Sequence, residues 1–318
     1  MDNEPNNNCC NFEAIKSFAM KPSLIFSQYV WLVNTLRRCG RLTLDEINSK
    51  WQEEEIADGN PLSRSTFNRH RDAVLDMFGV IIDCDVQDGY RYYIYNPEVL
   101  EDNTLERWML NSLTVGSVLA NSQSIHDRIL LENVPSGEEH LQTLIQAIKN
   151  NHKVELCYER FGHESYNINV APYALKLWHQ RWYLLCSTGK YLVTYSLDRM
   201  RSVKTLDETF ELPKDFSTQQ YFEDYYGVFT EKDAQLQHIV VRAYGKTPDY
   251  MRTLPFHSSQ KVLQTTEEYT DFSFDIRPTF DFLNALASAA CTGLEILEPT
   301  ALRAQMKEML QLALKLYI

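Results

Sequence analysis

The sequence has 318 residues, and because a domain usually holds about 100–200 residues, we expect more than one domain. Its composition, 44% hydrophobic and 23% charged, is that of an ordinary globular protein and excludes a fibrous or disordered chain. The net charge of −12 argues against a protein that coats nucleic acid nonspecifically, because such binding depends on neutralising phosphates. Any site for a polyanion must therefore be local.

The sequence carries no sign of a membrane segment, a cofactor or an active site. No apolar run approaches the roughly 18 residues of a membrane span, and the polar, acidic start does not resemble a secretory signal. We therefore expect a cytoplasmic protein. The seven cysteines lack zinc-site spacing and are interpreted as reduced, and the common phosphate-binding, hydrolase and metalloprotease motifs are absent. The prediction is a protein that is not an enzyme and has no cofactor or metal.

Three helices are predicted after an Asn-rich start, which we interpret as a disordered tail over residues 1–22. The first helix shows apolar residues at helical spacing over 29–36. The second begins at a capping box formed by Thr43 and Glu46. The third begins near Ser63 and ends at Gly79.

A β-hairpin follows the third helix. Two β-rich runs over residues 80–96 are joined by Asp88-Gly89, a strong signal for a tight turn. Three helices and a hairpin in this order predict a winged helix-turn-helix domain over residues 23–96.

The outer face of the third helix changes in polarity along its length. Its first turns are polar to basic, whereas its last turns carry Asp72 and Asp76. This gradient suits a helix that enters the major groove of DNA by its N-terminal end. Asn68 and Arg69 are residue types that read adenine and guanine edges, so they are the predicted base contacts. The other predicted DNA contacts are Arg64, Ser65 and Thr66 near the helix start and Arg91 in the hairpin.

Two neighbours on this helix point to packing. Arg71 lies close to the apolar stripe, so we expect it to form a structural pair, and we expect His70 to pack. The plain alternative for the whole face is a solvated surface, which the hairpin directly after the helix makes less attractive. The acidic residues of the hairpin count against strong DNA binding: Asp83, Asp85 and Asp88.

The rest of the chain changes texture twice. Residues 97–150 are predicted to form a helical linker. Residues 151–230 contain short alternating runs typical of a small antiparallel sheet or barrel. Residues 231–318 contain two strand-like runs followed by helical patterns near 280–291 and 302–317, which predict a C-terminal α+β unit.

One stretch resembles a known family. "RWYLLCS" at 181–187, preceded by "APYALKLWHQ" and followed by "YLVTYSLDRM", resembles the WYL domain. The segment beginning "STFNRHRDAVLDMF" and the segment "EILEPTALRAQM" are similar to the winged helix and the C-terminal extension that flank this domain in bacterial regulators. The residues that match the motif are Trp182, Tyr183, Leu184, Asp198 and Arg199, together with Lys176 on the approach.

The resemblance implies a bacterial, ligand-responsive transcriptional regulator. The implied fold is a multidomain α+β chain with a winged helix-turn-helix, a helical linker, an Sm-like small β-barrel and a C-terminal extension. The implied partners are double-stranded DNA, a nucleotide or oligonucleotide effector and a second copy in a homodimer. Where many family members carry arginines before Leu-Asp-Arg, this chain has Val193 and Ser196, which weakens the expectation of a phosphate-rich ligand.

The alternation of side chains divides the motif between two faces. Trp182, Leu184 and Cys186 are expected in a core, whereas Arg181 and Tyr183 face the other way. A nucleotide pocket needs a stacking ring and a cation for phosphate. The predicted ligand contacts are Tyr158, Lys176, His179, Arg181, Tyr183, Tyr195 and Arg199, with solvated charges as the alternative and Asp198 interpreted as orienting Arg199.

Two rival functions stay open. The first is an RNA or single-strand binding module whose winged helix mediates protein contacts, which the acidic hairpin would allow. The second is an enzyme that acts on nucleic acid, which the lack of an acidic metal cluster disfavours.

Overall fold

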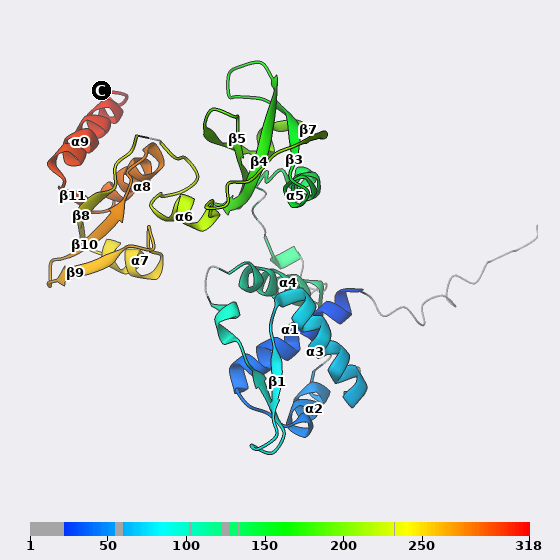
Figure 1. Ribbon diagram of the computed structural model, residues 1–318. Helices are drawn as coiled ribbons and strands as arrows, with labels where there is room; N and C mark the ends of the chain where they lie inside the picture. The colour runs from blue at the N-terminus through cyan, green and yellow to red at the C-terminus, as the bar shows by residue number, and fades with distance from the viewer. Residues whose placement is uncertain are drawn as a thin grey trace, which may run out of the picture. The chain divides into compact units, whose positions relative to one another are not determined.

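The structure, a computed structural model, describes residues 22–54, 60–101, 104–121, 127–130, 132, 134–231 and 233–318. The chain divides into two compact units, residues 1–131 and 132–318. Figure 1 shows the elements of both. The predicted tail over 1–22 lies outside the described residues except for Pro22. Within the described ranges, no helix is both long and apolar enough to cross a membrane.

The N-terminal unit consists of helices and one β-hairpin. Its elements are α1 (Pro22–Cys39), α2 (Leu44–Gln52), α3 (Arg64–Phe78), β1 (Ile82–Asp85), β2 (Arg91–Ile94), η2 (Pro97–Leu100) and α4 (Leu105–Asn121). The predicted order of three helices and a hairpin is confirmed. Leu42, between α1 and α2, also pairs with Tyr92 of β2. The arrangement is consistent with a winged helix-turn-helix.

Side-chain caps set the helix starts. The capping box before α2 is confirmed, because Glu46 donates its N–H to Thr43 Oγ1 over 3.2 Å and the Glu46 carboxylate accepts the Thr43 N–H over 2.8 Å. Ser63 accepts the N–H of Thr66 over 3.1 Å and so caps α3. Gly79, with φ of 63°, ends α3 in the left-handed region.

Arg71 ties α3 to the hairpin. Its Nε and Nη2 atoms donate to the carbonyl of Ile82 over 3.0 and 2.7 Å. Its guanidinium also lies 5.4 Å from the ring centre of Tyr92. The structural role predicted for Arg71 is confirmed. The hairpin is therefore fixed against the helix that it follows.

The hairpin loop is longer than the turn predicted at Asp88-Gly89. Strand pairing stops at Asp85 opposite Arg91, so that residues 86–90 form the loop. The carboxylate of Asp85 accepts the N–H groups of Gln87 and Asp88 over 3.0 and 3.1 Å, which stabilises the wider loop.

The predicted helical linker over 97–150 divides between the two units. In the N-terminal unit, α4 packs against α1, and Asn34 donates to Thr114 over 3.4 Å. In the C-terminal unit, η4 (Glu138–His140) leads into α5 (Leu141–Lys149). Leu144 and Ala147 of α5 are buried against the sheet that follows.

That sheet is open rather than closed into the predicted barrel. Its elements are β3 (His152–Tyr158), β4 (Tyr166–Trp178), β5 (Arg181–Ser187), β6 (Leu192–Ser196), η5 (Leu197–Arg199) and β7 (Met200–Thr209). The strands are antiparallel in the order β6-β5-β4-β3-β7. Over residues 134–231, which are described without a gap, no β6–β7 pairing closes the ring. The short η5 turn separates these two strands in sequence and their paths diverge to opposite edges.

Both faces of β5 are buried. Leu184 and Cys186 lie in a core with α5, and Trp182 packs against it, as predicted. Leu185 on the other face packs with Ala174 and with Phe222 of α6 (Thr218–Glu223). The alternation of side chains along β5 therefore divides two cores rather than a core and solvent.

The C-terminal part contains a second sheet. Its elements are β8 (Gln237–Tyr244), α7 (Thr247–Thr253), β9 (Lys261–Thr265), β10 (Tyr269–Ile276), α8 (Phe280–Ala290), β11 (Leu294–Glu298) and α9 (Thr300–Leu314). The strand order β11-β8-β10-β9 in a β-α-β-β-α-β chain is the split β-α-β topology. The predicted α+β unit is confirmed, although β9, α7 and β11 were not predicted.

The two faces of this second sheet differ in chemistry. Phe272 and Phe274 are fully buried in a core with Phe282 of α8. On the opposite face, Arg242 donates two hydrogen bonds to Asp271 over 2.7 and 2.9 Å and lies 3.7 Å from the ring centre of Tyr269. The guanidinium holds the pKa of the Asp271 carboxyl below its usual range. These polar side chains of the outer face are thus paired with one another.

We expect Gly137→Ala to destabilise the C-terminal unit strongly. Gly137 has φ of 70°, and an added Cβ would lie 2.4 Å from the carbonyl carbon of Leu197 and 2.6 Å from the nitrogen of Asp198. Backbone atoms cannot move aside cheaply, so a loss of roughly 3–5 kcal/mol is expected. Hydrogen exchange of the β5 amides measures it. Gly162→Ala is the matched control, because Gly162 has φ of 74° and open space around it, and should cost only about 1–2 kcal/mol. Equal losses would contradict the close approach.

We also expect acid to destabilise the N-terminal unit through His70. Its ring is buried between Tyr29 and Trp51, at centroid distances of 5.1 and 5.9 Å, which confirms its predicted packing role. Burial, aided by the charge of Arg69, lowers the pKa of His70 from 6.5 to about 4. The unfolded chain therefore binds this proton at a higher pH than the folded chain does. Stability is complete above pH 6.5 and falls towards pH 4, by up to about 3 kcal/mol.

Chemical denaturation of wild type and His70→Phe at several pH values tests this sign. The other titrating groups contribute equally to both proteins. The free energy of unfolding of His70→Phe relative to wild type should therefore increase as the pH falls below 6.5. A difference that does not change with pH would contradict it.

Candidate functional site

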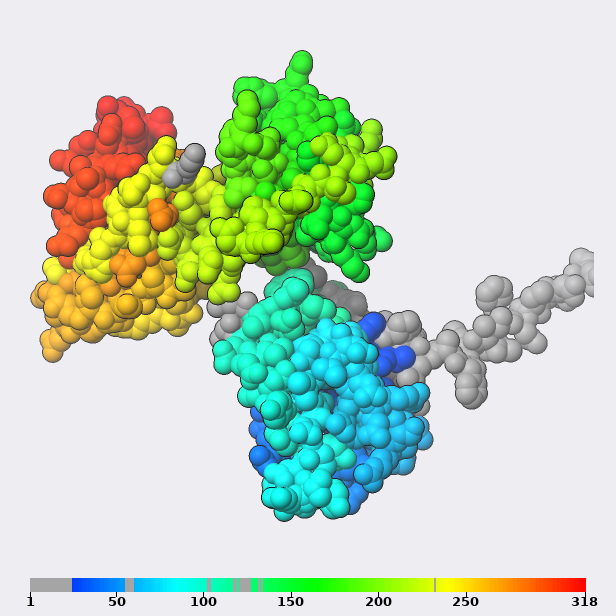
Figure 2. Space-filling model, viewed as in Figure 1, coloured from blue at the N-terminus to red at the C-terminus, as the bar shows by residue number. Residues whose placement is uncertain are grey.

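The predicted DNA-reading residues lie together on the surface of α3. Arg64, Ser65, Asn68 and Arg69 are exposed, and Thr66 is half-buried. Figure 2 shows α3 at the surface of the N-terminal unit. Among the described residues, the side chains of Arg64 and Asn68 have no hydrogen-bond or ion-pair partner. Their polar groups are therefore available to a ligand.

Arg69 is held weakly within its own helix. Its Nη2 donates to the hydroxyl of Thr66 over 3.4 Å, and Ser63 donates to the same hydroxyl over 2.9 Å. A bond of this length is easily exchanged for one to a base edge. Asp72 and Asp76 are exposed further along α3, so the predicted change from a basic start to an acidic end is present in space.

Arg91, the predicted cation of the hairpin, is already engaged. It lies 3.4 Å from a carboxylate oxygen of Glu46 and 4.0 Å from one of Asp88, and it donates to the carbonyl of Arg41 over 3.2 Å. Arg91 is therefore partly neutralised by its own unit, which reduces its expected contribution to phosphate binding.

Sequence reasoning missed Arg41. Its guanidinium lies 2.7 Å from Asp85 and 3.5 Å from Asp88, and 4.5 Å from the ring centre of Tyr93. Its hydrogen bond lowers the pKa of Asp85. Two of the three acidic residues that count against DNA binding, Asp85 and Asp88, thus share one arginine, whereas Asp83 has no cation partner among the described residues. The neighbouring residue Leu42 pairs with Tyr92 of the hairpin, a long-range contact that the sequence does not reveal.

A tyrosine–arginine cluster forms at one end of the first sheet of the C-terminal unit. Tyr158 and Tyr195, both predicted ligand residues, are buried with ring centres 4.6 Å apart, and Tyr166 lies 6.2 Å from Tyr158. Arg199, also predicted, lies 5.3 Å from the ring centre of Tyr158. The three predicted residues are thus brought together, but the tyrosine rings face the core.

Two further members of the cluster were not predicted. Phe161, 77% exposed, lies with its ring centre 4.7 Å from the Arg199 guanidinium. Arg160 lies 5.2 Å from the ring centre of Tyr166. Within the described part of the chain, neither Arg160 nor Arg199 is paired with a carboxylate. The signal in the sequence was the pair Arg160-Phe161 directly after a strand.

Tyr183 does not offer the stacking surface expected of it. Its side chain is only 8% exposed, because the second face of β5 is also covered, and burial raises its pKa. The exposed ring beside a cation is Phe161 instead. Asp198 pairs with Arg181 at 3.6 Å and accepts a hydrogen bond from Ser196, so the expected pairing of Asp198 with Arg199 is replaced by one with Arg181.

Lys176 and His179 lie in a different environment from Arg199. Lys176 Nζ donates to the carbonyl of Gly227 over 2.6 Å and lies 4.0 Å from the ring centre of Phe222. Burial lowers the pKa of Lys176 to about 8. His179 lies on the ring of Trp178 with centroids 4.1 Å apart. Lys176 contacts the segment that leads into the second sheet, and His179 contacts its neighbour Trp178, so these contacts give no support to the predicted ligand-binding role of either residue.

The cluster can bind an anion beside a flat group. Two guanidiniums without carboxylate partners favour phosphate oxygens, and an exposed phenylalanine ring favours stacking. Over the described ranges, no three His, Cys, Asp or Glu side chains are grouped to hold a metal ion. The chemistry on view is recognition of a ligand.

Comparison with known proteins identifies one part of the chain. Residues 139–205 match the WYL domain family. No curated protein matches the sequence. Proteasome accessory factor B/C of Arthrobacter aurescens is 16% identical with a TM-score of 0.35, and the match covers 91% of this chain and 46% of that chain. A CRISPR Cas-related protein is 14% identical with a TM-score of 0.35, covering 93% and 85%. The chain spans about half the length of the first of these. Residues 139–205, which hold the tyrosine–arginine cluster, are therefore a WYL domain.

Proposed function

We propose that this chain is a DNA-binding transcriptional regulator whose WYL domain senses a nucleotide or a short nucleic acid. One observation carries the proposal. The start of α3 exposes Arg64, Asn68 and Arg69, on the helix that a winged helix-turn-helix places in the major groove.

Charge supports a local rather than a general contact with DNA. The chain as a whole carries −12, which repels phosphates. The α3 start is basic and the hairpin acids Asp85 and Asp88 are paired with Arg41. Docking is therefore favourable where the helix start meets the groove and unfavourable elsewhere, so sequence-specific contacts must contribute much of the affinity.

The tyrosine–arginine cluster supports a nucleotide or short nucleic acid as the effector. A nucleotide presents a flat base and at least one phosphate, and Phe161 with Arg160 and Arg199 offers a ring and two cations. Arg160 supplies positive charge that Val193 and Ser196 do not. A response requires that the ligand favour one arrangement of two DNA-binding units, as in a homodimer that reads half-sites about one helical turn apart.

An alternative uses the same cluster differently. An exposed ring next to arginines without carboxylate partners among the described residues also suits RNA or single-stranded DNA as the main target, with the winged helix contacting protein. Selection of bound sequences from random duplexes and from random single strands, with and without a short oligonucleotide, separates the two. Enrichment of a duplex motif that the oligonucleotide alters supports the regulator. Enrichment of single strands alone overturns it.

Arg69→Ala should weaken binding to a selected duplex by about 1–3 kcal/mol and relax the preference at one base position, because we propose that Arg69 reads a base edge. Arg64→Ala is the comparison. It should weaken all sequences alike and reduce the salt dependence by about one charge, as expected for a phosphate contact. Titrations at several salt concentrations measure both. Unchanged affinity in Arg69→Ala would remove that residue from the interface.

Arg199→Ala should abolish the effect of a short oligonucleotide on DNA binding while the chain stays folded. Arg199 lacks a carboxylate partner among the described residues, so its loss removes a ligand contact and leaves no buried charge unpaired. Arg201→Ala is a matched control, because Arg201 is exposed and paired with Glu159 at 2.6 Å. Circular dichroism checks folding. A normal response in Arg199→Ala, or an equal loss in Arg201→Ala, would contradict the assignment.

A further inference from the structure

A hollow, which we call the junction pocket, lies between the five-stranded sheet β3–β7, called the WYL sheet, and the C-terminal extension, residues 231–318. Its volume is about 700 Å³, within the roughly 300–1,000 Å³ range of small-molecule sites. Its walls come from the tip of the β4–β5 hairpin, from Tyr226, from α7 with the loop to Phe256, and from the end of α8. None of these residues belongs to the tyrosine–arginine cluster.

Aromatic rings form the inner wall of the junction pocket. Trp178 and Tyr226 meet edge to face with centroids 5.8 Å apart, and Phe256 lies 6.3 Å from Tyr226. The hairpin tip is a two-residue turn in which His179 and Gln180 both have positive φ, 48° and 63°. This turn folds the His179 ring over Trp178. The wall therefore offers flat surfaces at different angles, as aromatic ligands prefer.

The threonines of the pocket add little polarity. Thr247 donates its hydroxyl to the carbonyl of Thr292 over 2.9 Å, and Thr292 donates to Ala289 over 2.9 Å. Thr253 donates to the carbonyl of Asp249 over 3.1 Å. With these hydroxyls bound to backbone, no free threonine donor is left for a ligand at these three positions.

The pocket also lacks a charge for an ionic ligand. Among the described residues that line it there is no lysine, arginine, aspartate or glutamate, and His179 is the single histidine. A carboxylate or phosphate that entered would lose its hydration without an opposite charge, which is costly. At the rim, Tyr250 and Leu254 are 71% and 81% exposed, so a ligand would cover apolar surface that now faces water.

We propose that the junction pocket binds a flat, uncharged aromatic molecule of small size. This site differs from the tyrosine–arginine cluster in position and in chemistry, since that cluster has two arginines and the junction pocket has none among its described lining residues. A ligand here contacts both the hairpin tip of the WYL sheet and α7 of the extension. The proposal stands or falls independently of whether the chain binds DNA.

The test uses N-phenyl-1-naphthylamine, a neutral probe that fluoresces in apolar sites, titrated into the full chain. Saturable binding with one site per chain is expected. Leu254→Ser should weaken it about tenfold, because one leucine-sized apolar contact is lost, and Tyr250→Ala should weaken it as well. Both side chains are largely exposed, so neither change should unfold the chain. Absence of saturable binding, or unchanged affinity in both variants, overturns the proposal.

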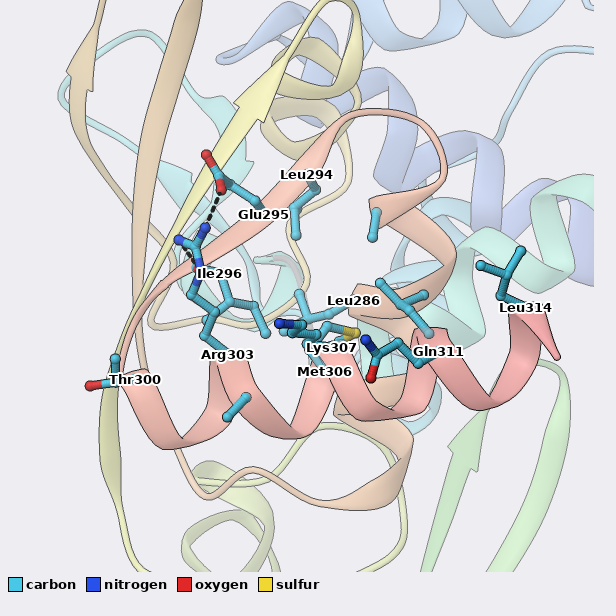
Figure 3. A pocket seen from close by; sticks show the side chains of 13 residues that line it. Leu286, Leu294, Glu295, Ile296, Thr300, Arg303, Met306, Lys307, Gln311 and Leu314 are labelled. Atoms are coloured by element: carbon cyan, nitrogen blue, oxygen red, sulfur yellow. Dashed lines mark hydrogen bonds and ion pairs between the residues drawn. The ribbon is translucent and has the colours of Figure 1, made fainter.

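A control is needed because the extension has another apolar hollow. Figure 3 shows this groove between α9 and β11, lined by apolar side chains that include Leu286, Met306 and Leu314, with Lys307 and the Arg303–Glu295 pair beside them. Leu310 lines it and is 38% exposed. Leu310→Ser should leave probe affinity unchanged. If Leu310→Ser weakens binding and Leu254→Ser does not, the probe occupies the α9 groove and the proposal fails.

The charge requirement has its own comparison. 8-Anilinonaphthalene-1-sulfonate carries the same two ring systems with an added sulfonate. It should bind the junction pocket at least tenfold more weakly than the neutral probe, as judged by the part of its binding that Leu254→Ser removes. Equal or tighter binding of the sulfonate at that site would overturn the neutral class of ligand.

Discussion

The central strand β4 holds the two halves of the WYL sheet together by hydrogen bonds. The first part of this strand pairs with β3, the second part pairs with β5, and the register shifts between Pro172 and Ala174. Proline has no N–H to give, so a bulge at this position is a natural place for the strand to change partners. Tyr158 faces Tyr166 across one pairing, and Trp178 faces Arg181 across the other. A shift of one residue in the pairing of β4 with its neighbours would move its side chains to the opposite face of the sheet. Neither the tyrosine–arginine cluster nor the junction pocket would then form.

The tyrosines of the sheet are buried, whereas the arginines beside them lie near the surface. Burial on both faces withdraws Tyr158, Tyr183 and Tyr195 from solvent, while Arg160 and Arg199 stay near the surface with their guanidiniums over aromatic rings. A cation held over a ring is positioned without being neutralised. The result is a small positive area on a chain that is acidic overall, which suits capture of a compact anion.

Local patterns in the sequence were informative where local interactions decide the structure. The capping box, the inward residues of α3, the structural role of Arg71 and the core face of β5 could all be predicted, because spacing along one element determines them. The contacts of Arg41 and Arg160 could not be predicted. Arg41 lies next to a bridge between distant residues, and Arg160 reaches Tyr166 because β3 pairs with β4.

Strand existence was harder to predict than strand faces. β9 is exposed along its whole length, so it lacks the alternation of apolar and polar residues that marks a half-buried strand. The alternating pattern left a sheet or a barrel open, and family resemblance favoured the barrel. Closure of a barrel depends on which strand edges meet. That property depends on strand curvature and loop paths rather than on the pattern of any single strand.

The outer face of the second sheet is chemically occupied. Four-stranded sheets of similar layout can serve as platforms on which exposed rings stack bases. Here Arg242 already lies over the ring of Tyr269 and donates two hydrogen bonds to Asp271. Gln264 donates to the same carboxylate over 2.6 Å. A polynucleotide strand that bound this face would first have to break the bidentate Arg242–Asp271 pair. The buried Asp271 carboxylate would then face the phosphates of the polynucleotide. This face of the extension is therefore unsuited to a polynucleotide strand as long as the Arg242–Asp271 pair holds.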